Sequence, residues 1–126
     1  ILDGVPKAMP ALAYSQAIQK RAARVGFDWD EDSGVIEKVA EEAGEIINAQ
    51  NLKEKESEFG DLLFTLANLA RRQGIDLESA LREANQKFYK RFTTMEHLCF
   101  ERGQELANLD FEEQNKLWEE SKNLQK

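Results

Sequence analysis

Residues 34–73 read GVIEKVAEEAGEIINAQNLKEKESEFGDLLFTLANLARRQ, and this stretch decides the fold class. Its apolar residues recur every three or four positions, which is the spacing of an amphipathic helix. We predict two helices here, over residues 34–49 and 52–73. Asp32 or Ser33 is expected to cap the first helix, and Gly74 is expected to end the second.

The rest of the chain continues the helical pattern. Both prolines fall within the first ten residues, and helix-favouring residues dominate from residue 11 onward. Further helices are predicted over residues 10–24, 76–101 and 110–122, with Asp76 as one cap and Asp110 with Glu113 as a capping box. We therefore expect an all-α bundle of about five helices. It should form a single domain, 1–126, with residues 1–8 as an extended leader.

Charge and composition narrow the class of partner. The net charge of -7 argues against a nucleic-acid polymer, but a metal ion could still bring a small phosphorylated ligand to an acidic site. No apolar run approaches the ~20 residues of a membrane span, so we expect no membrane partner. We expect no secretory signal, because the first residues, Ile1-Leu2-Asp3-Gly4, offer neither a basic nor an apolar region. The chain starts at Ile1 rather than Met, so we expect it to be cut from something longer. The single Cys99 fits a reducing, cytoplasmic location.

Acidic residues lie on the apolar side of the first central helix. At about 100° per residue, Glu42 falls within about 20° of the stripe that begins at Val35. Glu45 and Lys38 border that stripe, whereas Glu41 points further out. This helix therefore presents an i, i+3 pair of carboxylates, Glu42 and Glu45, beside its buried face.

The next helix repeats the arrangement with Glu58 and Asp61, which flank its leucine stripe. Packing the two faces together would bring four carboxylates close, and Mg²⁺ or Mn²⁺ would compensate their repulsion. A solvated acidic face is the ordinary alternative, and for a single pair it is the better one. A di-iron bundle normally needs Glu-x-x-His pairs. It is disfavoured because no Glu precedes the only histidine, His97, by three residues.

Two cationic residues, Lys87 and Arg91, share an arc with apolar positions of the fourth helix. Taken alone, they are best explained as long stems that cover the core. Beside a metal–carboxylate cluster they are candidate phosphate ligands. Trp118 and Lys122 repeat the i, i+4 spacing on the last helix, and Trp118 is either a core aromatic residue or a surface on which a base stacks.

Two glycines interrupt the central helices at a cost of about 1 kcal/mol each relative to alanine. Gly44 and Gly60 both lie opposite the acidic cluster. We expect them to permit close packing of helices, including packing across a subunit interface.

The motifs in order resemble the MazG-type all-α nucleoside triphosphate pyrophosphohydrolases over nearly the whole chain, and more narrowly the C-terminal half of the two-domain members. The residues that carry the resemblance are Pro10-Ala11-Leu12, Gln16-Ala17-Ile18-Gln19-Lys20-Arg21, Val25-Gly26-Phe27-Asp28-Trp29, Glu41-Glu42-x-x-Glu45, Glu58-x-Gly60-Asp61-Leu62-Leu63-Phe64, Ala84-Asn85-x-Lys87-Phe88-x-x-Arg91-Phe92 and Trp118-x-x-x-Lys122.

This resemblance implies a tight homodimer and a set of roles for individual residues. The metal ligands would be Glu42, Glu45, Glu58 and Asp61. The catalytic residues would be Glu41, Glu42, Glu45 and Lys38. The residues that contact phosphate or nucleotide would be Lys38, Lys55, Lys87, Arg91, Trp118 and Lys122. Glu54 departs from the pattern because the family usually has a phosphate-binding lysine there, and Lys53 or Lys55 would have to substitute.

The implied reaction is Mg²⁺-dependent hydrolysis of nucleoside triphosphates to monophosphate and pyrophosphate. Water would attack the α-phosphorus, with Glu41 or Glu45 orienting it. One histidine and one cysteine make a nucleophilic triad not credible. Two alternatives stay open: a pyrophosphatase selective for dUTP or dCTP on the same fold, and a non-catalytic helical dimerisation module.

Overall fold

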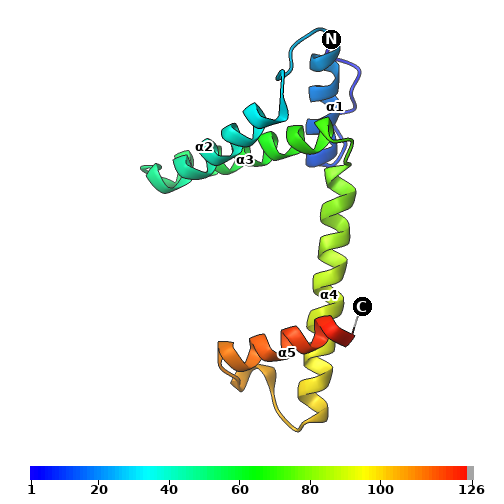
Figure 1. Ribbon diagram of the computed structural model, residues 1–126, viewed down its shortest axis with the longest axis vertical. Coiled ribbons are helices and arrows are strands. Elements are labelled where there is room, and N and C mark those ends of the chain that lie inside the picture. The colour runs from blue at the N-terminus through cyan, green and yellow to red at the C-terminus, as the bar shows by residue number, and fades with distance from the viewer. Residues whose placement is uncertain (125–126) are drawn as a thin grey trace. The chain divides into compact units, whose positions relative to one another are not determined.

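The computed structural model describes residues 1–124, and every regular element in them is helical (Figure 1). The elements are α1 (Ala11–Arg24), α2 (Asp32–Asn48), α3 (Leu52–Arg72), α4 (Leu77–Glu101), a short 3₁₀ helix η1 (Leu106–Asn108) and α5 (Phe111–Leu124). The predicted all-α class and the five α-helices are confirmed. The chain divides into two compact units, residues 1–80 and residues from 81 onward, and α4 begins in the first.

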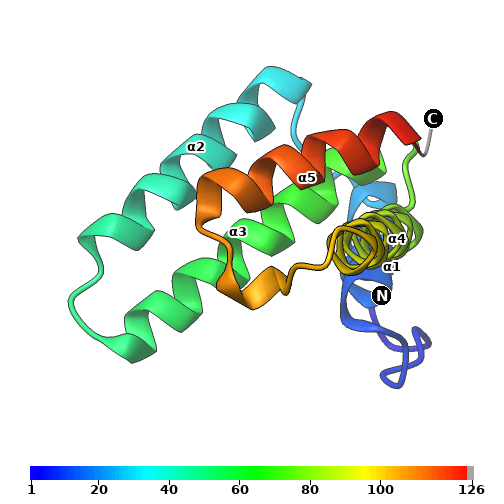
Figure 2. The same cartoon turned by 90° about the horizontal axis from the view of Figure 1, so that it is seen from below.

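In the first unit, α3 packs against both α2 and α1. Helices α2 and α3 run side by side in opposite directions, as two views show (Figures 1 and 2). Val35, where the apolar stripe predicted for α2 begins, is fully buried, and so is Ala67 of α3. The leucine stripe predicted for α3 is half-buried at Leu62, Leu66 and Leu69. Helix α1 lies against the second half of α3, where Gln19 Nε2 donates to the Phe64 carbonyl at 2.9 Å.

One glutamine of α1 connects three helices. Gln16 Nε2 donates to the carbonyl oxygens of Ala67 and Ile75, both at 3.0 Å. Its Oε1 accepts from the backbone N–H of Leu77 at 3.1 Å, at the first residue of α4. The end of α3 and the start of α4 are therefore both tied to α1.

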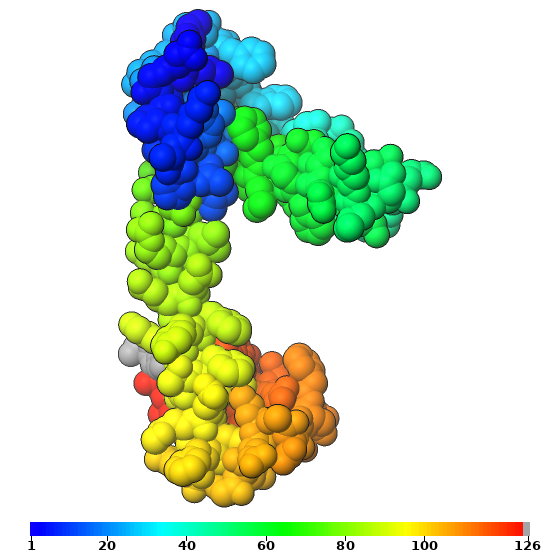
Figure 3. Space-filling view, turned by 180° about the vertical axis from the view of Figure 1, so that it is seen from behind, coloured from blue at the N-terminus to red at the C-terminus, as the bar shows by residue number. Residues whose placement is uncertain are grey.

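The leader is turned rather than extended, which corrects the expectation for residues 1–8. Val5 N–H donates to the Leu2 carbonyl and Met9 N–H to the Pro6 carbonyl, which closes two turns. Val5 is buried, and Arg21 of α1 donates to the Ile1 carbonyl at 3.3 Å. The leader therefore lies over α1, as its dark blue surface shows (Figure 3).

The predicted cap of α2 is wrong. The helix begins at Asp32, two residues before the predicted start, and it follows Glu31 with no side-chain cap. Asp32 does not cap because its Oδ1 accepts a 2.6 Å hydrogen bond from Arg72 Nε. Ser33 does not cap either, because its hydroxyl donates to Glu31. Contacts with the distant end of α3 thus override the local preference.

The other predicted helix ends are confirmed. Gly74 follows α3 with a φ of +74°, a conformation that favours glycine. Asp76 Oδ1 accepts from the Ser79 N–H at 3.3 Å before α4. Asp110 Oδ1 accepts from the Glu113 N–H at 2.8 Å before α5, which is one half of the predicted capping box.

The second unit is built on part of α4, η1 and α5. Its core consists of Met95, Cys99 and Leu117. Arg102 donates from both terminal nitrogens to the Glu120 carboxylate, and this bidentate pair joins the end of α4 to α5. No helix in residues 1–124 combines the length and the apolar character needed to cross a bilayer.

Candidate active site

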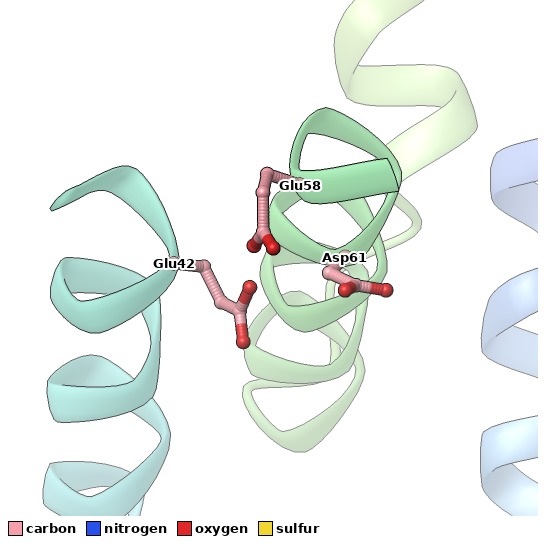
Figure 4. A group of neighbouring side chains, drawn as sticks. All are labelled: Glu42, Glu58 and Asp61. Atoms are coloured by element: carbon pink, nitrogen blue, oxygen red, sulfur yellow. The ribbon is translucent and has the colours of Figure 1, made fainter. Parts of the chain in front are cut away.

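Three carboxylates from α2 and α3 meet in the first unit. Glu42 extends from α2 toward Glu58 and Asp61 of α3 (Figure 4). Each offers one oxygen, and these oxygens all lie within 4.8 Å of one another. Glu42 is only 5% exposed, as its place on the apolar stripe predicts. Within residues 1–124, this is the one group of three or more acidic, histidine or cysteine side chains so arranged.

A lysine compensates part of this negative charge. Lys38 Nζ lies 2.8 Å from Glu42 Oε1 and 3.5 Å from Glu41 Oε1. The hydrogen bond from Lys38 lowers the pKa of Glu42 and outweighs the opposing effect of burial. The same hydrogen bond raises the pKa of Lys38. Glu42 and Lys38 are thus both held in their charged forms.

Glu58 shows the opposite shift. Hydrogen bonding with Glu45, burial and hydrogen bonding with Glu42 raise the pKa of Glu58 to about 7. The carboxyl of Glu45 therefore contacts both Glu42 and Glu58, although Glu45 is not one of the three residues whose oxygens share the 4.8 Å cluster. Without further positive charge, the cluster keeps a proton that an ordinary glutamate would lose.

The cluster fits a hard divalent cation. Glu42 Oε2 and Glu58 Oε2 are both buried and have no hydrogen-bond partner among the described residues. Buried acceptors without partners are costly, and an oxygen-liganded cation would satisfy both of them. Carboxylate oxygens are the ligands that Mg²⁺ and Mn²⁺ prefer.

A pocket of about 750 Å³ lies beside the cluster. Lys38, which binds Glu42, also lines this pocket, and so does Thr65, whose hydroxyl donates to the Asp61 carbonyl at 2.9 Å. Five aromatic and amide side chains also line it, beside aliphatic and acidic residues. They are Phe27, Trp29, Phe64, Gln19 and Asn68.

The loop between α1 and α2, residues 27–31, forms one wall of the pocket, and two arginines of α3 hold it. Arg72 Nη1 donates to the Trp29 carbonyl at 2.6 Å, and Arg71 Nη2 donates to Asp28 Oδ1 at 2.8 Å. Burial raises the pKa of Asp28. Hydrogen bonds from Arg71, the Trp29 N–H and Arg72 more than offset that effect, and its pKa lies below the ordinary value.

This pocket was not predicted from the sequence. The sequence predicts only a connection between two helices at Phe27, Asp28 and Trp29, and these residues otherwise served only for the family resemblance. An aromatic–acidic–aromatic run beside a helix start was the available signal. The acidic partners of Arg71 and Arg72 could not be predicted from the sequence, because Asp28 and Asp32 lie some forty residues earlier.

The predicted phosphate-binding residues of the later helices lie in the second unit. The Arg91 guanidinium carbon lies 5.7 Å from the centre of the Trp118 ring, a cation–π distance. Lys122 Nζ lies 3.5 Å from Glu119, and Lys87 is exposed. Arg91 and Trp118 are therefore brought together, while the carboxylate cluster belongs to the other unit.

The departure from the family pattern at Glu54 has a structural explanation. Glu54 N–H donates to Asn51 Oδ1 at 2.9 Å, and Glu54 Oε2 accepts from the Gln50 N–H at 2.7 Å. These two bonds cap the start of α3. Lys55, the predicted substitute for the missing lysine, is exposed on the same turn. His97 is also exposed, and its Nε2 lies 3.0 Å from Glu101.

Gly44 and Gly60 were predicted to permit close packing of helices. Between helices of the described chain, this prediction is wrong. A Cβ at Gly44 or Gly60 would meet nothing within 4 Å, so no other described part of the first unit packs closely on either residue. Both glycines face open space, and packing across a subunit interface stays a prediction.

Comparison with known proteins identifies the family. Residues 13–88 match the profile of the phosphoribosyl-ATP pyrophosphohydrolase family. A MazG nucleoside triphosphate pyrophosphohydrolase/pyrophosphatase of Thermotoga maritima is 46% identical over 114 residues, which cover 90% of this chain and 45% of the relative. A nucleoside triphosphate pyrophosphohydrolase of Escherichia coli K12 is 41% identical over 126 residues, covering 96% of this chain and 48% of the relative.

An uncharacterized protein of Bacillus subtilis, YabN, is 43% identical over 133 residues that cover 100% of this chain and 27% of the relative. The chain thus spans half or less of the length of these curated relatives. The family match spans both α2 and α3, the helices that bear the carboxylate cluster. The chain therefore belongs to the phosphoribosyl-ATP pyrophosphohydrolase family, as a domain of the MazG type homologous to nucleoside triphosphate pyrophosphohydrolases.

Proposed function

We propose that this domain hydrolyses nucleoside triphosphates to nucleoside monophosphate and pyrophosphate, by attack of water on the α-phosphorus. One observation carries the proposal. A carboxylate cluster with two unpartnered buried oxygens adjoins a pocket with aromatic walls, and Lys38 belongs to both. A ligand that combines metal-bound phosphates with a flat ring matches these two neighbouring surfaces. The homology to MazG pyrophosphohydrolases supports the same reaction.

Mg²⁺, or Mn²⁺ in its place, would be held by Glu42, Glu58 and Asp61, with Glu45 as the predicted fourth ligand. When bound, such an ion would polarise the phosphates and supply a water of lowered pKa. Glu58 would give up its proton on metal binding, because the cation replaces the charge that the proton supplies.

Lys38 is the cationic group closest to this site in the first unit. Its ammonium contacts Glu42 and lines the pocket, so it can stabilise negative charge that develops on a phosphoryl oxygen beside the metal. Lys55, Lys87, Arg91 and Lys122 are proposed as further phosphate contacts, and Trp118 as a group that closes the nucleotide site.

Two carboxylates are candidates to orient the attacking water. Glu45 contacts Glu42 and Glu58, so it lies beside the cluster of Glu42, Glu58 and Asp61. Glu41 is exposed and contacts Lys38 at its edge. The contacts of Glu45 favour it for either metal ligation or proton acceptance, and Glu41 keeps the role of an outer base.

The pocket beside the cluster is proposed to hold the base. Its volume of about 750 Å³ is that of an ordinary small-ligand site. The rings of Phe27, Trp29 and Phe64 offer stacking surfaces, and the amides of Gln19 and Asn68 offer hydrogen-bonding groups. Selectivity for dUTP or dCTP, the second candidate function, would arise in this pocket.

The test is pyrophosphate release from a panel of ribo- and deoxynucleoside triphosphates during a Mg²⁺ titration. Turnover of the whole panel supports the broad activity, whereas turnover of dUTP or dCTP alone supports the selective one. Asp61→Ala and Glu42→Ala should abolish release while circular dichroism shows an intact helical fold. In ¹⁸O-labelled water, nucleoside diphosphate and labelled orthophosphate as main products would refute attack at the α-phosphorus. If no nucleotide is hydrolysed, the remaining hypothesis is a non-catalytic helical dimerisation module.

We also propose that the domain acts as a homodimer in the cytoplasm. Helices α2 and α3 each expose apolar side chains, with Ile47 at 85%, Leu52 at 72% and Phe59 at 53% exposure. Monomeric proteins rarely leave large contiguous apolar patches in contact with water. A two-fold interface, in which the same patch meets itself, would cover them.

A further inference from the structure

We propose that Arg71 and Arg72 are positioning residues that hold the loop of residues 27–31 as a rigid wall for the ring of the substrate. This inference rests on the proposed function, because it assumes that the base occupies the pocket. Neither arginine lines the pocket or belongs to the carboxylate cluster. Both would act only through the loop and through Asn68.

Arg72, at the end of α3, makes the central contacts. Its Nε donates to Asp32 Oδ1 at 2.6 Å, and its Nη1 donates to the Trp29 carbonyl at 2.6 Å. The same Nη1 lies 3.1 Å from Asp28 Oδ1. The planar guanidinium therefore binds the loop and the first residue of α2 together, and its side chain is only 14% exposed. A lysine could not reproduce this fixed set of donors.

Arg71 extends the contact to another residue of the pocket. Its Nη2 donates to Asp28 Oδ1 at 2.8 Å and its Nε to Asn68 Oδ1 at 3.0 Å. Because arginine can only donate, it must bind the carbonyl oxygen of the Asn68 amide. The NH₂ group of Asn68 is then the part that can meet a ligand, and it would donate to a carbonyl or ring nitrogen of the base.

Trp29 is fixed at three points. Its backbone N–H donates to Asp28 Oδ1 at 2.8 Å, its carbonyl accepts from Arg72, and its ring lies against Gly34. A Cβ at Gly34 would come within 3.1 Å of the indole, so glycine allows this approach. The indole stays 46% exposed and lines the pocket, so it can still contact a ligand.

These contacts give the arginines a specific kinetic role. A loop outside a helix has no regular backbone hydrogen bonds, so without Arg72 it would gain conformational freedom that the substrate must remove on binding. That cost falls on the bound substrate and the transition state alike. The affinity for nucleotide should therefore fall while the chemical step is retained.

The experiment compares Arg72→Gln with Arg24→Gln, a control that removes the same charge from the exposed end of α1. Arg72→Gln should raise KM for nucleoside triphosphates about tenfold at nearly constant kcat, which corresponds to about 1.4 kcal/mol. Binding of imidodiphosphate with Mg²⁺, which has no base, should be unchanged. Arg24→Gln should match the wild type in both assays.

Tryptophan fluorescence tests directly whether the loop of residues 27–31 is held in place. The sequence has two tryptophans, so in a Trp118→Phe background all indole emission comes from Trp29. Arg72→Gln should then shift this emission to the red and increase its quenching by acrylamide. Arg72→Lys and Asp28→Asn, which disturb the loop less, should give smaller shifts in the same direction, and they carry the test if Arg72→Gln does not fold.

The proposal is overturned if folded Arg72 variants keep wild-type KM and wild-type Trp29 emission. It is also overturned if they lower kcat at unchanged KM, or weaken imidodiphosphate binding equally. A wild-type protein that hydrolyses no nucleoside triphosphate would instead refute the proposed function. In that case the Trp29 emission still decides whether the arginines hold the loop.

Discussion

At the scale of single residues, Glu58 shows how the first unit accommodates its acidic cluster. Three glutamates lie in hydrogen-bonding contact, and Lys38 bonds to only one of them, Glu42. Glu42 keeps its charge because of that lysine, whereas Glu58 holds a proton up to a pH of about 7. Two chemically identical side chains thus titrate differently because only one has a cationic neighbour.

A first prediction concerns the pH dependence of stability without metal. The pKa of Glu58 rises from 4.5 to about 7 on folding, so the folded protein binds a proton that the unfolded chain has lost. This contribution to stability is fully present below pH 4.5 and is lost as the pH rises through about 7. In chelator, the Tm of the wild type should therefore fall more over this range than the Tm of Glu58→Gln.

Added Mg²⁺ provides the complementary measurement. Metal binding should raise the Tm most at alkaline pH, where Glu58 is already ionised and no proton has to leave. If the wild type and Glu58→Gln show the same pH profile in chelator, the raised pKa of Glu58 is refuted.

At the scale of helices, the sequence predicts what depends on the period of a single element. The ranges of α2 and α3 follow from apolar residues at helical spacing. The same periodicity placed Glu42 and Glu58 on the faces that meet. A carboxylate on an apolar stripe is visible in the sequence because its neighbours on the helix surface are fixed by the helix itself.

Features that join distant elements were not predictable in this way. The predicted cap of α2 is wrong because Asp32 accepts a hydrogen bond from Arg72, forty residues away. The pocket was missed because its walls come from α1, the loop of residues 27–31, α2 and α3 together. No single helical period or local motif records how these segments meet.

A second prediction concerns Gln16, which ties α1 to the end of α3 and the start of α4. Gln16→Leu removes hydrogen bonds to Ala67 and Ile75 and one from Leu77. We expect a loss of about 2 kcal/mol in the free energy of unfolding, at roughly 0.5–1.5 kcal/mol for each bond. Urea unfolding measures the change, and Gln86→Leu on the exposed face of α4 is the matched control. Equal losses for the two variants would contradict the connecting role of Gln16.

At the scale of the whole molecule, the exposed apolar residues of α2 and α3 and the two glycines support the proposed dimer. A Cβ at Gly44 or Gly60 would meet no other described part of the chain within 4 Å, so the described residues leave room for a Cβ at both positions. A substitution at either glycine therefore tests assembly directly, because its Cβ would meet open space in the single chain.

The third prediction is that Gly60→Leu disrupts the dimer and reduces turnover together. Leucine removes a helix-interior glycine, so the monomer itself should gain up to about 0.7 kcal/mol of helix stability. Light scattering and pyrophosphate release, measured at the same protein concentrations, follow the two effects. A wild-type protein that is a fully active monomer at micromolar concentration would refute the dimer and leave the metal site unaffected.

The unpartnered oxygens of Glu42 and Glu58 also matter to anyone who tries to make this domain more robust. A screen for heat resistance in chelator would reward apolar replacements at both positions, because they remove buried acceptors that have no hydrogen-bond partner. Such winners would refold well and bind no cation. The residues that limit thermal stability are the proposed metal ligands. Selections for thermostability should therefore be run with Mg²⁺ and scored for turnover in the same round.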